Sequence, residues 1–126
     1  MSFPADRRES RRAIVGSEFR ISFSLKGQAF SDVRITNLSA GGCFALVGAR
    51  EAPRFQRGTA LEGLMLLHPE LPMPPLRAVV SYVLAHRPGL TPLETIGLGI
   101  QFLDMDRASR EALETWVDAA CASRRG

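Results

Sequence analysis

Cysteine and long apolar runs are scarce in this sequence of 126 residues. The two cysteines, Cys43 and Cys121, lack the spacing of metal ligands, so neither a zinc site nor a disulfide scaffold is expected. No segment approaches the length of a membrane span, and the N-terminus lacks the apolar run of a signal peptide. We therefore expect a cytoplasmic protein that does not insert into a membrane.

The residue types that carry catalysis are equally sparse. A serine or cysteine nucleophile needs a base, and the two histidines, His68 and His86, lie beside proline-rich loops in no recognisable catalytic setting. The carboxylates are scattered, so neither a carboxylate dyad nor a metal cluster emerges. No phosphate-binding glycine loop precedes a helix. The sequence therefore predicts a protein that is not an enzyme and needs no metal or cofactor.

What the sequence does contain is a globular composition and one basic cluster. Hydrophobic residues make up 45% and charged residues 23%, which are ordinary values for a single folded domain. The net charge is only +3, but Arg7, Arg8, Arg11 and Arg12 fall close together near the start. Residues 1–12 have few apolar side chains and are predicted to form a flexible arm. Such an arm suits one small anionic ligand or a short contact better than a long polyanion.

Alternating apolar and polar residues predict strands through most of the remaining chain. The expected strands are 19–25, 29–36, 43–47, 61–67, 76–86 and 96–102. Residues 61–67 are apolar nearly throughout, which is typical of a strand covered on both faces. In the last strand Gly97 and Gly99 leave one face bare, so another element can lie close to it.

Apolar residues recur at helical spacing near the C-terminus, between about residues 107 and 122, and predict an amphipathic helix. Asp104 or Asp106 can cap its N-terminus. Six short strands followed by one helix predict a mainly β fold, a small antiparallel barrel with the helix packed on it. The predicted organisation is an arm at 1–12, a barrel with its helix at 13–122 and a tail at 123–126.

The stretch of residues 36–42, Thr-Asn-Leu-Ser-Ala-Gly-Gly, joins two predicted strands and carries polar groups. If the extended backbone persists through Leu38, then Asn37 and Ser39 leave the same face while Leu38 enters the core. The two glycines that follow allow a positive φ or a close approach of the backbone to another group. Taken alone, these residues fit an ordinary turn.

The arginines and this turn make a chemically coherent pair. Arginine binds phosphate through two parallel hydrogen bonds and reads the O6 and N7 edge of guanine with the same planar group. Four such side chains on a mobile arm can close over an anionic purine ligand. Asn37 and Ser39 would contact other edges of the base, and Gly41 and Gly42 would let the backbone approach it.

The motif Arg7-Arg8-x-x-Arg11, followed by Asn37-x-Ser39-x-x-Gly42, resembles the two-part signature of PilZ domains. These domains are bacterial receptors for the second messenger cyclic di-GMP. The strand after the arm, the run Gly-Leu-Gly-Ile-Gln-Phe and the closing helix also match that family, so the resemblance covers nearly the whole chain. It implies a six-stranded barrel that binds cyclic di-GMP on its outer surface.

The resemblance also implies roles for single residues. Arg7 and Arg11, with Arg8 beside them, match the arginines that bind guanine and phosphate. Because Arg12 lies four residues after Arg8, the pair Arg8 and Arg12 is an equally spaced alternative.

In the second half of the signature, Asn37 matches a position, often aspartate, that bonds a guanine edge. Ser39 matches the hydroxyl position and Gly42 the closing glycine. An amide can donate and accept hydrogen bonds but lacks the charge that favours the donors of guanine.

Signalling is expected to depend on the arm. Ordering it costs about 1 to 2 kcal/mol per residue, so the free arm should be loose and the bound ligand should clamp it against the barrel. The new surface would then act on a downstream protein partner. Two alternatives remain open: a ligand-independent PilZ-like adaptor for motility or pilus machinery, and a binder of single-stranded nucleic acid. The sequence argues against the second, because Phe19 and Phe23 fall on the apolar side of their strand instead of being exposed for stacking.

Overall fold

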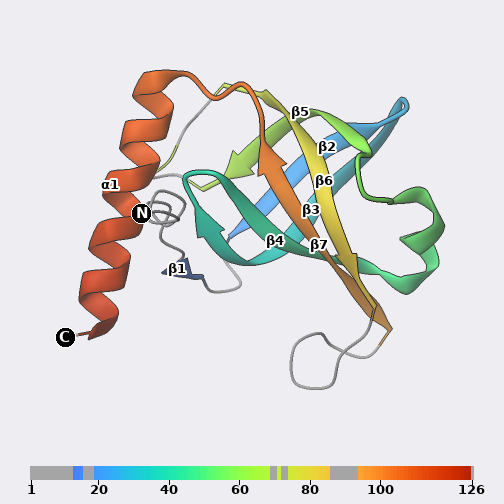
Figure 1. Ribbon diagram of the computed structural model, residues 1–126, viewed down its shortest axis with the longest axis horizontal. Helices are drawn as coiled ribbons and strands as arrows, with labels where there is room; N and C mark the ends of the chain where they lie inside the picture. Colours follow the sequence, from blue (N-terminus) through green and yellow to red (C-terminus); the bar gives the residue numbers. More distant parts are fainter. Residues whose placement is uncertain (1–12, 16–18, 69–70, 72–73, 86–93, 126) are drawn as a thin grey trace, which may run out of the picture.

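The computed structural model describes residues 13–15, 19–68, 71, 74–85 and 94–125. The chain forms a closed six-stranded antiparallel barrel with one extra strand and a C-terminal helix (Figure 1). The arm predicted at residues 1–12 and His86 lie outside the described residues.

The barrel closes through one continuous series of strand pairs. Its strands are β2 (Arg20–Leu25), β3 (Gln28–Ser39), β4 (Gly42–Gly48), β5 (Ala60–Leu67), β6 (Leu76–Leu84) and β7 (Thr95–Phe102). They follow the order β3-β2-β5-β6-β7-β4, and β3 also pairs with β4, which closes the ring. The extra strand β1 (Ala13–Ile14) pairs with β3. The other elements are the 3-10 helix η2 (Ala49–Arg54) and the helix α1 (Arg107–Arg125).

Alternation along the strands fills the interior of the barrel. The side chains of Ile21, Ile35 and Leu98 have no exposed surface, and they belong to one cluster of buried apolar residues. The β2 to β3 hairpin turns through Lys26 and Gly27, whose φ angles are 50° and 84°. A two-residue hairpin turn needs positive φ at both positions to match the twist of the strands, which is why glycine follows lysine there.

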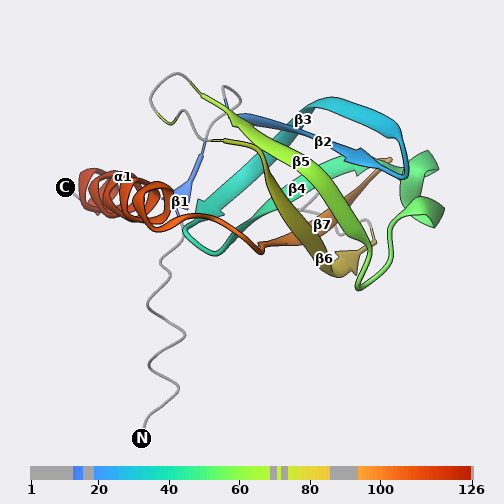
Figure 2. The same ribbon diagram turned by 90° about the horizontal axis from the view of Figure 1, so that it is seen from above.

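Helix α1 lies across one end of the barrel beside β1, whereas η2 lies at the other end (Figures 1 and 2). Leu113 and Val117 of α1 are buried. The ring of Trp116 lies 5.0 Å from that of Phe19, which itself stacks on His68 at 4.1 Å. These aromatic contacts join the start of β2, the end of β5 and the helix.

The structure differs from the sequence expectations in several places. Strand β3 continues through Ser39, so the predicted turn is shorter, and α1 ends at Arg125 instead of near residue 122. The prediction that residues 61–67 are covered on both faces was wrong, because Met65 and Leu67 are exposed on the outside of the barrel. The connection between β4 and β5, where no helix was predicted, contains η2, and β1 was not predicted at all.

Asp104 and Asp106 have separate structural tasks. Asp106 caps α1, since its Oδ1 accepts the Ser109 backbone N–H at 2.7 Å. Asp104 accepts the backbone N–H of Arg77 at 2.7 Å and its Nε–H at 3.1 Å, which ties the start of β6 to the chain leaving β7. These hydrogen bonds favour the carboxylate form and lower the pKa of Asp104, the Arg77 backbone bond contributing most.

The first prediction concerns the Asp106 cap of α1. Asp106→Ala should lower the free energy of unfolding by about 1 kcal/mol, because the first free amides of α1 lose their side-chain acceptor. Asp106→Asn should stay close to the wild type, since asparagine caps helices equally well. Denaturant unfolding measures both. An alanine variant as stable as the wild type would show that the cap does not hold the helix.

Candidate functional site

The extra strand β1 brings the end of the predicted arm to the predicted turn. Ala13 pairs with Leu38 and Ile14 with Asn37, and the Val15 backbone N–H donates to the Thr36 carbonyl at 3.0 Å. The residue that follows Arg12 in the chain is therefore fixed beside β3. Arg7, Arg8, Arg11 and Arg12 themselves lie outside the part of the chain that the structure describes.

Asn37 belongs to a strand and not to a turn. Leu38 is fully buried in the core, as the alternation predicted, and its neighbours Asn37 and Ser39 take the opposite side. The register shifts between Ile35 and Asn37, a β-bulge that turns Asn37 to the outer face. Across β3, Asn37 pairs with Ile14 on one side and with Phe44 on the other.

Ser39 holds the tight turn that follows β3. Its side chain is 3% exposed. Its Oγ accepts the Gly41 backbone N–H at 3.2 Å and donates to the Gly42 carbonyl at 3.3 Å. The hydroxyl thus satisfies backbone groups that the turn between β3 and β4 would otherwise leave without a partner.

Gly42 is required by a close approach of two strands. A β-carbon built on Gly42 would lie 2.0 Å from the carbonyl oxygen of Ile100 in β7. Gly42 pairs there with Gln101, and the neighbouring Gly41 carbonyl accepts the Phe102 backbone N–H at 2.9 Å. Neither glycine of the pair has a positive φ. Of the two uses that the sequence left open, close approach is the one found at Gly42.

The bare face of β7 is covered by aromatic rings from its two neighbours. A β-carbon on Gly97 would lie 2.1 Å from the ring of Phe44 in β4, and one on Gly99 would lie 2.2 Å from the ring of Tyr82 in β6. The two rings are stacked with centroids 6.2 Å apart. The sequence therefore predicted correctly that another element lies close to these glycines. It could not identify Phe44 and Tyr82 as the neighbours, because that depends on strand register.

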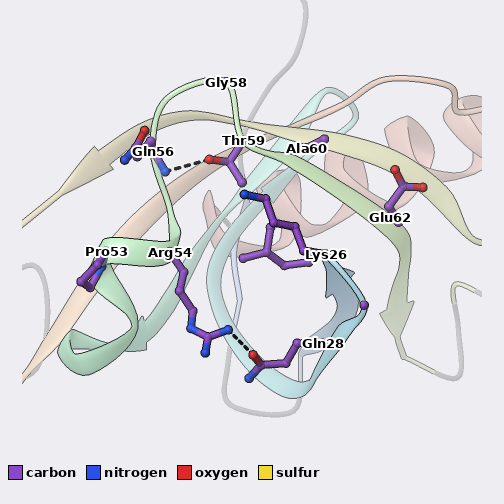
Figure 3. A pocket seen from close by; sticks show the side chains of 11 residues that line it. Lys26, Gln28, Pro53, Arg54, Gln56, Gly58, Thr59, Ala60 and Glu62 are labelled. Atoms are coloured by element: carbon purple, nitrogen blue, oxygen red, sulfur yellow. Dashed lines mark hydrogen bonds between the residues drawn. The ribbon is translucent and has the colours of Figure 1, made fainter.

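A pocket of about 630 Å³ lies at the other end of the barrel (Figure 3). Arg54 Nη1 donates to Gln28 Oε1, and its Nε lies 3.2 Å from a carboxylate oxygen of Glu51. Lys26 and Glu62 also line the pocket, so its charges are mixed. Since β3 runs from Gln28 to Ser39, this pocket lies at the opposite end of the strand from the predicted site.

Within the described ranges, no three His, Cys, Asp or Glu side chains gather to hold a metal ion. The helices in these ranges are too short or too polar to span a bilayer.

A family model described as the PilZ domain matches residues 6–119. A sequence comparison with characterised proteins gave no significant match.

Several solved structures have the same fold. The PilZ domain of YcgR from Escherichia coli, solved with c-di-GMP, superposes with a TM-score of 0.70 at 15% identity, covering 94% of this chain and 95% of that one. The MrkH–c-di-GMP complex of K. pneumonia gives a TM-score of 0.74 at 17% identity, covering 94% and 55%. The Bacillus subtilis inhibitor of motility, MotI/DgrA, gives 0.73 at 18%, covering 94% and 52%. The chain thus spans about half the length of the last two proteins.

The contact between Gly42 and Ile100 gives a stability prediction. Gly42→Ala should lower the free energy of unfolding by about 1 to 3 kcal/mol, because the new methyl group pushes β4 away from the β7 backbone. Gly48→Ala is the matched control at the other end of β4. Its φ of −65° suits alanine and nothing lies within 4 Å of the added carbon, so its stability should not fall. Equal stability of the two variants would contradict the account.

Proposed function

Because this chain belongs to the PilZ domain family, we propose that it is a receptor for cyclic di-GMP. The ligand would lie on the outer face of the barrel, between the arginines of the N-terminal arm and Asn37. Two proteins with the same fold, YcgR and MrkH, have been solved with c-di-GMP. Their identity to this chain is low, so the proposal depends mainly on the residues described above.

The pairing of β1 with β3 is the observation that carries the proposal. It fixes Ala13 beside Leu38, and Arg11 and Arg12 immediately precede Ala13 in the sequence. A residue spans at most about 3.6 Å of extended chain, so even Arg7 is within roughly 20 Å of this anchor. For comparison, a patch of the outer face that is three strand spacings wide measures about 14 Å. The arm is therefore long enough to bring all its arginines over a ligand seated at Asn37.

The residue types suit a ligand with two phosphates and two guanines. Arginine gives charge-assisted, paired hydrogen bonds to phosphate or to the O6 and N7 of guanine. The Asn37 amide has both a donor and an acceptor for another edge of the base. We assign Ser39, Gly41 and Gly42 mainly to shaping the turn beside this seat, since the Ser39 hydroxyl already bonds two backbone groups.

Binding would order the arm and thereby change the surface offered to a partner protein. Charge-assisted hydrogen bonds contribute about 1.5 to 3 kcal/mol each, so several of them offset the roughly 6 to 12 kcal/mol needed to order six residues. The anchor strand β1 contacts α1 as well as β3. The new surface would therefore form next to the helix.

Calorimetric titration tests the proposed ligand and the arginines together. The wild type should bind cyclic di-GMP at micromolar or better affinity, with no heat from GMP or a short single-stranded oligonucleotide. Arg7→Ala or Arg11→Ala should weaken binding by about thirty- to a thousand-fold, through the loss of roughly 2 to 4 kcal/mol of paired contacts. Arg57→Ala, which removes an exposed arginine from the loop after η2, is the control and should bind normally.

The outcomes separate the alternatives. Full loss in Arg8→Ala and Arg12→Ala, with normal binding in the other pair, would assign the register to Arg8 and Arg12. No binding by the wild type would overturn the receptor and favour the ligand-independent adaptor. Binding of the oligonucleotide with a steep dependence on salt would favour nucleic acid instead.

Hydrogen exchange tests the switch separately from binding. Amides of residues 5–12 should exchange quickly in the free protein and be protected once cyclic di-GMP is bound, because the arm becomes ordered against the barrel. Amides of β5, a strand that pairs with neither β1, β3 nor β4, serve as the internal control and should change little. Equal exchange of residues 5–12 with and without ligand would remove the switch while leaving the binding site intact.

A further inference from the structure

Two aromatic side chains lie on the outside of the barrel, next to the proposed ligand seat. Cys43 and Ala45 point into the buried cluster, so Phe44 between them points outward. Tyr82 also lies on the outer side, because its ring occupies the space that a β-carbon of Gly99 would take. The two rings are neighbours, with centroids 6.2 Å apart and planes inclined at 30°.

Strand register connects these rings to Asn37 in a single row. Asn37 pairs with Phe44, Phe44 with Gly99, and Gly99 with Tyr82. On the other side Asn37 pairs with Ile14, whose side chain is 65% exposed. The row crosses five strands, β1, β3, β4, β7 and β6, at right angles to their direction. Three strand spacings separate Asn37 from Tyr82, about 14 Å.

The two rings differ in how much surface they leave open. Phe44 is 8% exposed, whereas Tyr82 is 40% exposed. An aromatic ring over a glycine is a common way to stabilise a strand pair, and that role accounts for the position of both rings, Phe44 over Gly97 and Tyr82 over Gly99. That role does not account for the 40% of Tyr82 that stays exposed. Phe44 supports Tyr82 from one side, which leaves the other side of the phenol ring available.

We infer that Tyr82 is a stacking platform for the second guanine of the dinucleotide whose first guanine is held at Asn37. The inference rests on the proposed function and extends its site across β4 and β7 to β6. Every base has a π-face that stacks on an aromatic ring, so this end of the row binds a purine by contact area and not by hydrogen bonding. The bare backbone of Gly99 beneath the ring lets the phenol lie low on the sheet, within the row.

Substitution of Tyr82 tests the platform directly. Tyr82→Ala should weaken cyclic di-GMP binding roughly 5- to 150-fold, the usual effect of removing one stacked base contact. Tyr82→Phe keeps the ring and should bind within about twofold of the wild type. Met65→Ala is the matched control, because Met65 is 39% exposed on β5, outside the row, and its loss should not change affinity.

The ring of Tyr82 can also be observed directly by nuclear magnetic resonance. Tyr82 is the one tyrosine in the sequence, so its ring resonances are assigned without ambiguity. A guanine stacked on it should move these resonances upfield on addition of cyclic di-GMP. Unmoved resonances in a protein that binds the ligand would overturn the platform.

Gly99→Ala separates stacking from a general effect on the fold. Its β-carbon would lie 2.2 Å from a ring atom of Tyr82, so the ring must swing away, which an exposed side chain can do without unfolding the barrel. Gly99→Ala alone should bind cyclic di-GMP more weakly than the wild type. Added to Tyr82→Ala, it should weaken binding little beyond the effect of Tyr82→Ala alone. Equal losses in both backgrounds would mean that Gly99 acts through the backbone and would overturn the inference.

The failure of this inference can be told apart from that of the proposed function. If the wild type binds cyclic di-GMP and Arg7→Ala or Arg11→Ala weakens binding while Tyr82→Ala does not, the platform is wrong and the receptor stands. If the wild type does not bind cyclic di-GMP at all, both are wrong.

Discussion

The barrel depends on the close approach of β4 to β7, which glycine makes possible. At Gly42 the missing side chain lets the strand reach the carbonyl of Ile100, and the pairing of β4 with β7 continues from there to Gly48 and Thr95. On the outer face of β7, the missing side chains at Gly97 and Gly99 leave room for two aromatic rings. The residues that close the barrel therefore also shape its outer surface, which is where the ligand is proposed to bind.

The site combines a fixed part and a part that the sequence predicts to move. Asn37, Phe44 and Tyr82 stand on paired strands, so their spacing is set by register and changes little. The arginines precede β1, a strand of two residues that is held by β3 and contacts α1. A dinucleotide bound to both parts would hold the arm in place, and β1, which joins the arm to the barrel, would carry this change to the end of the barrel where α1 lies.

Much of this arrangement could be predicted from the sequence, because it depends on local patterns. Alternation predicted five of the six barrel strands, a nearly continuous apolar run predicted the strand at 61–67, and helical spacing predicted α1. Strand β1 was missed because two residues, Ala13 and Ile14, carry no period. Asn37 and Ser39 looked like turn residues, yet pairing with β1 and β4 draws Asn37 into a strand. The position of Tyr82 opposite Gly99 follows a register shift next to Ser81, which no local pattern reveals.

The most direct test of the account is the location of the ligand on the protein. Nuclear magnetic resonance of the nitrogen-labelled protein, titrated with cyclic di-GMP, would map the amides whose shifts change. The account predicts changes along the outer row, at Ile14, Asn37, Phe44 and Gly99, with the amides around the pocket of Figure 3 nearly unmoved. Changes concentrated around that pocket, near Lys26 and the end of η2, would contradict it.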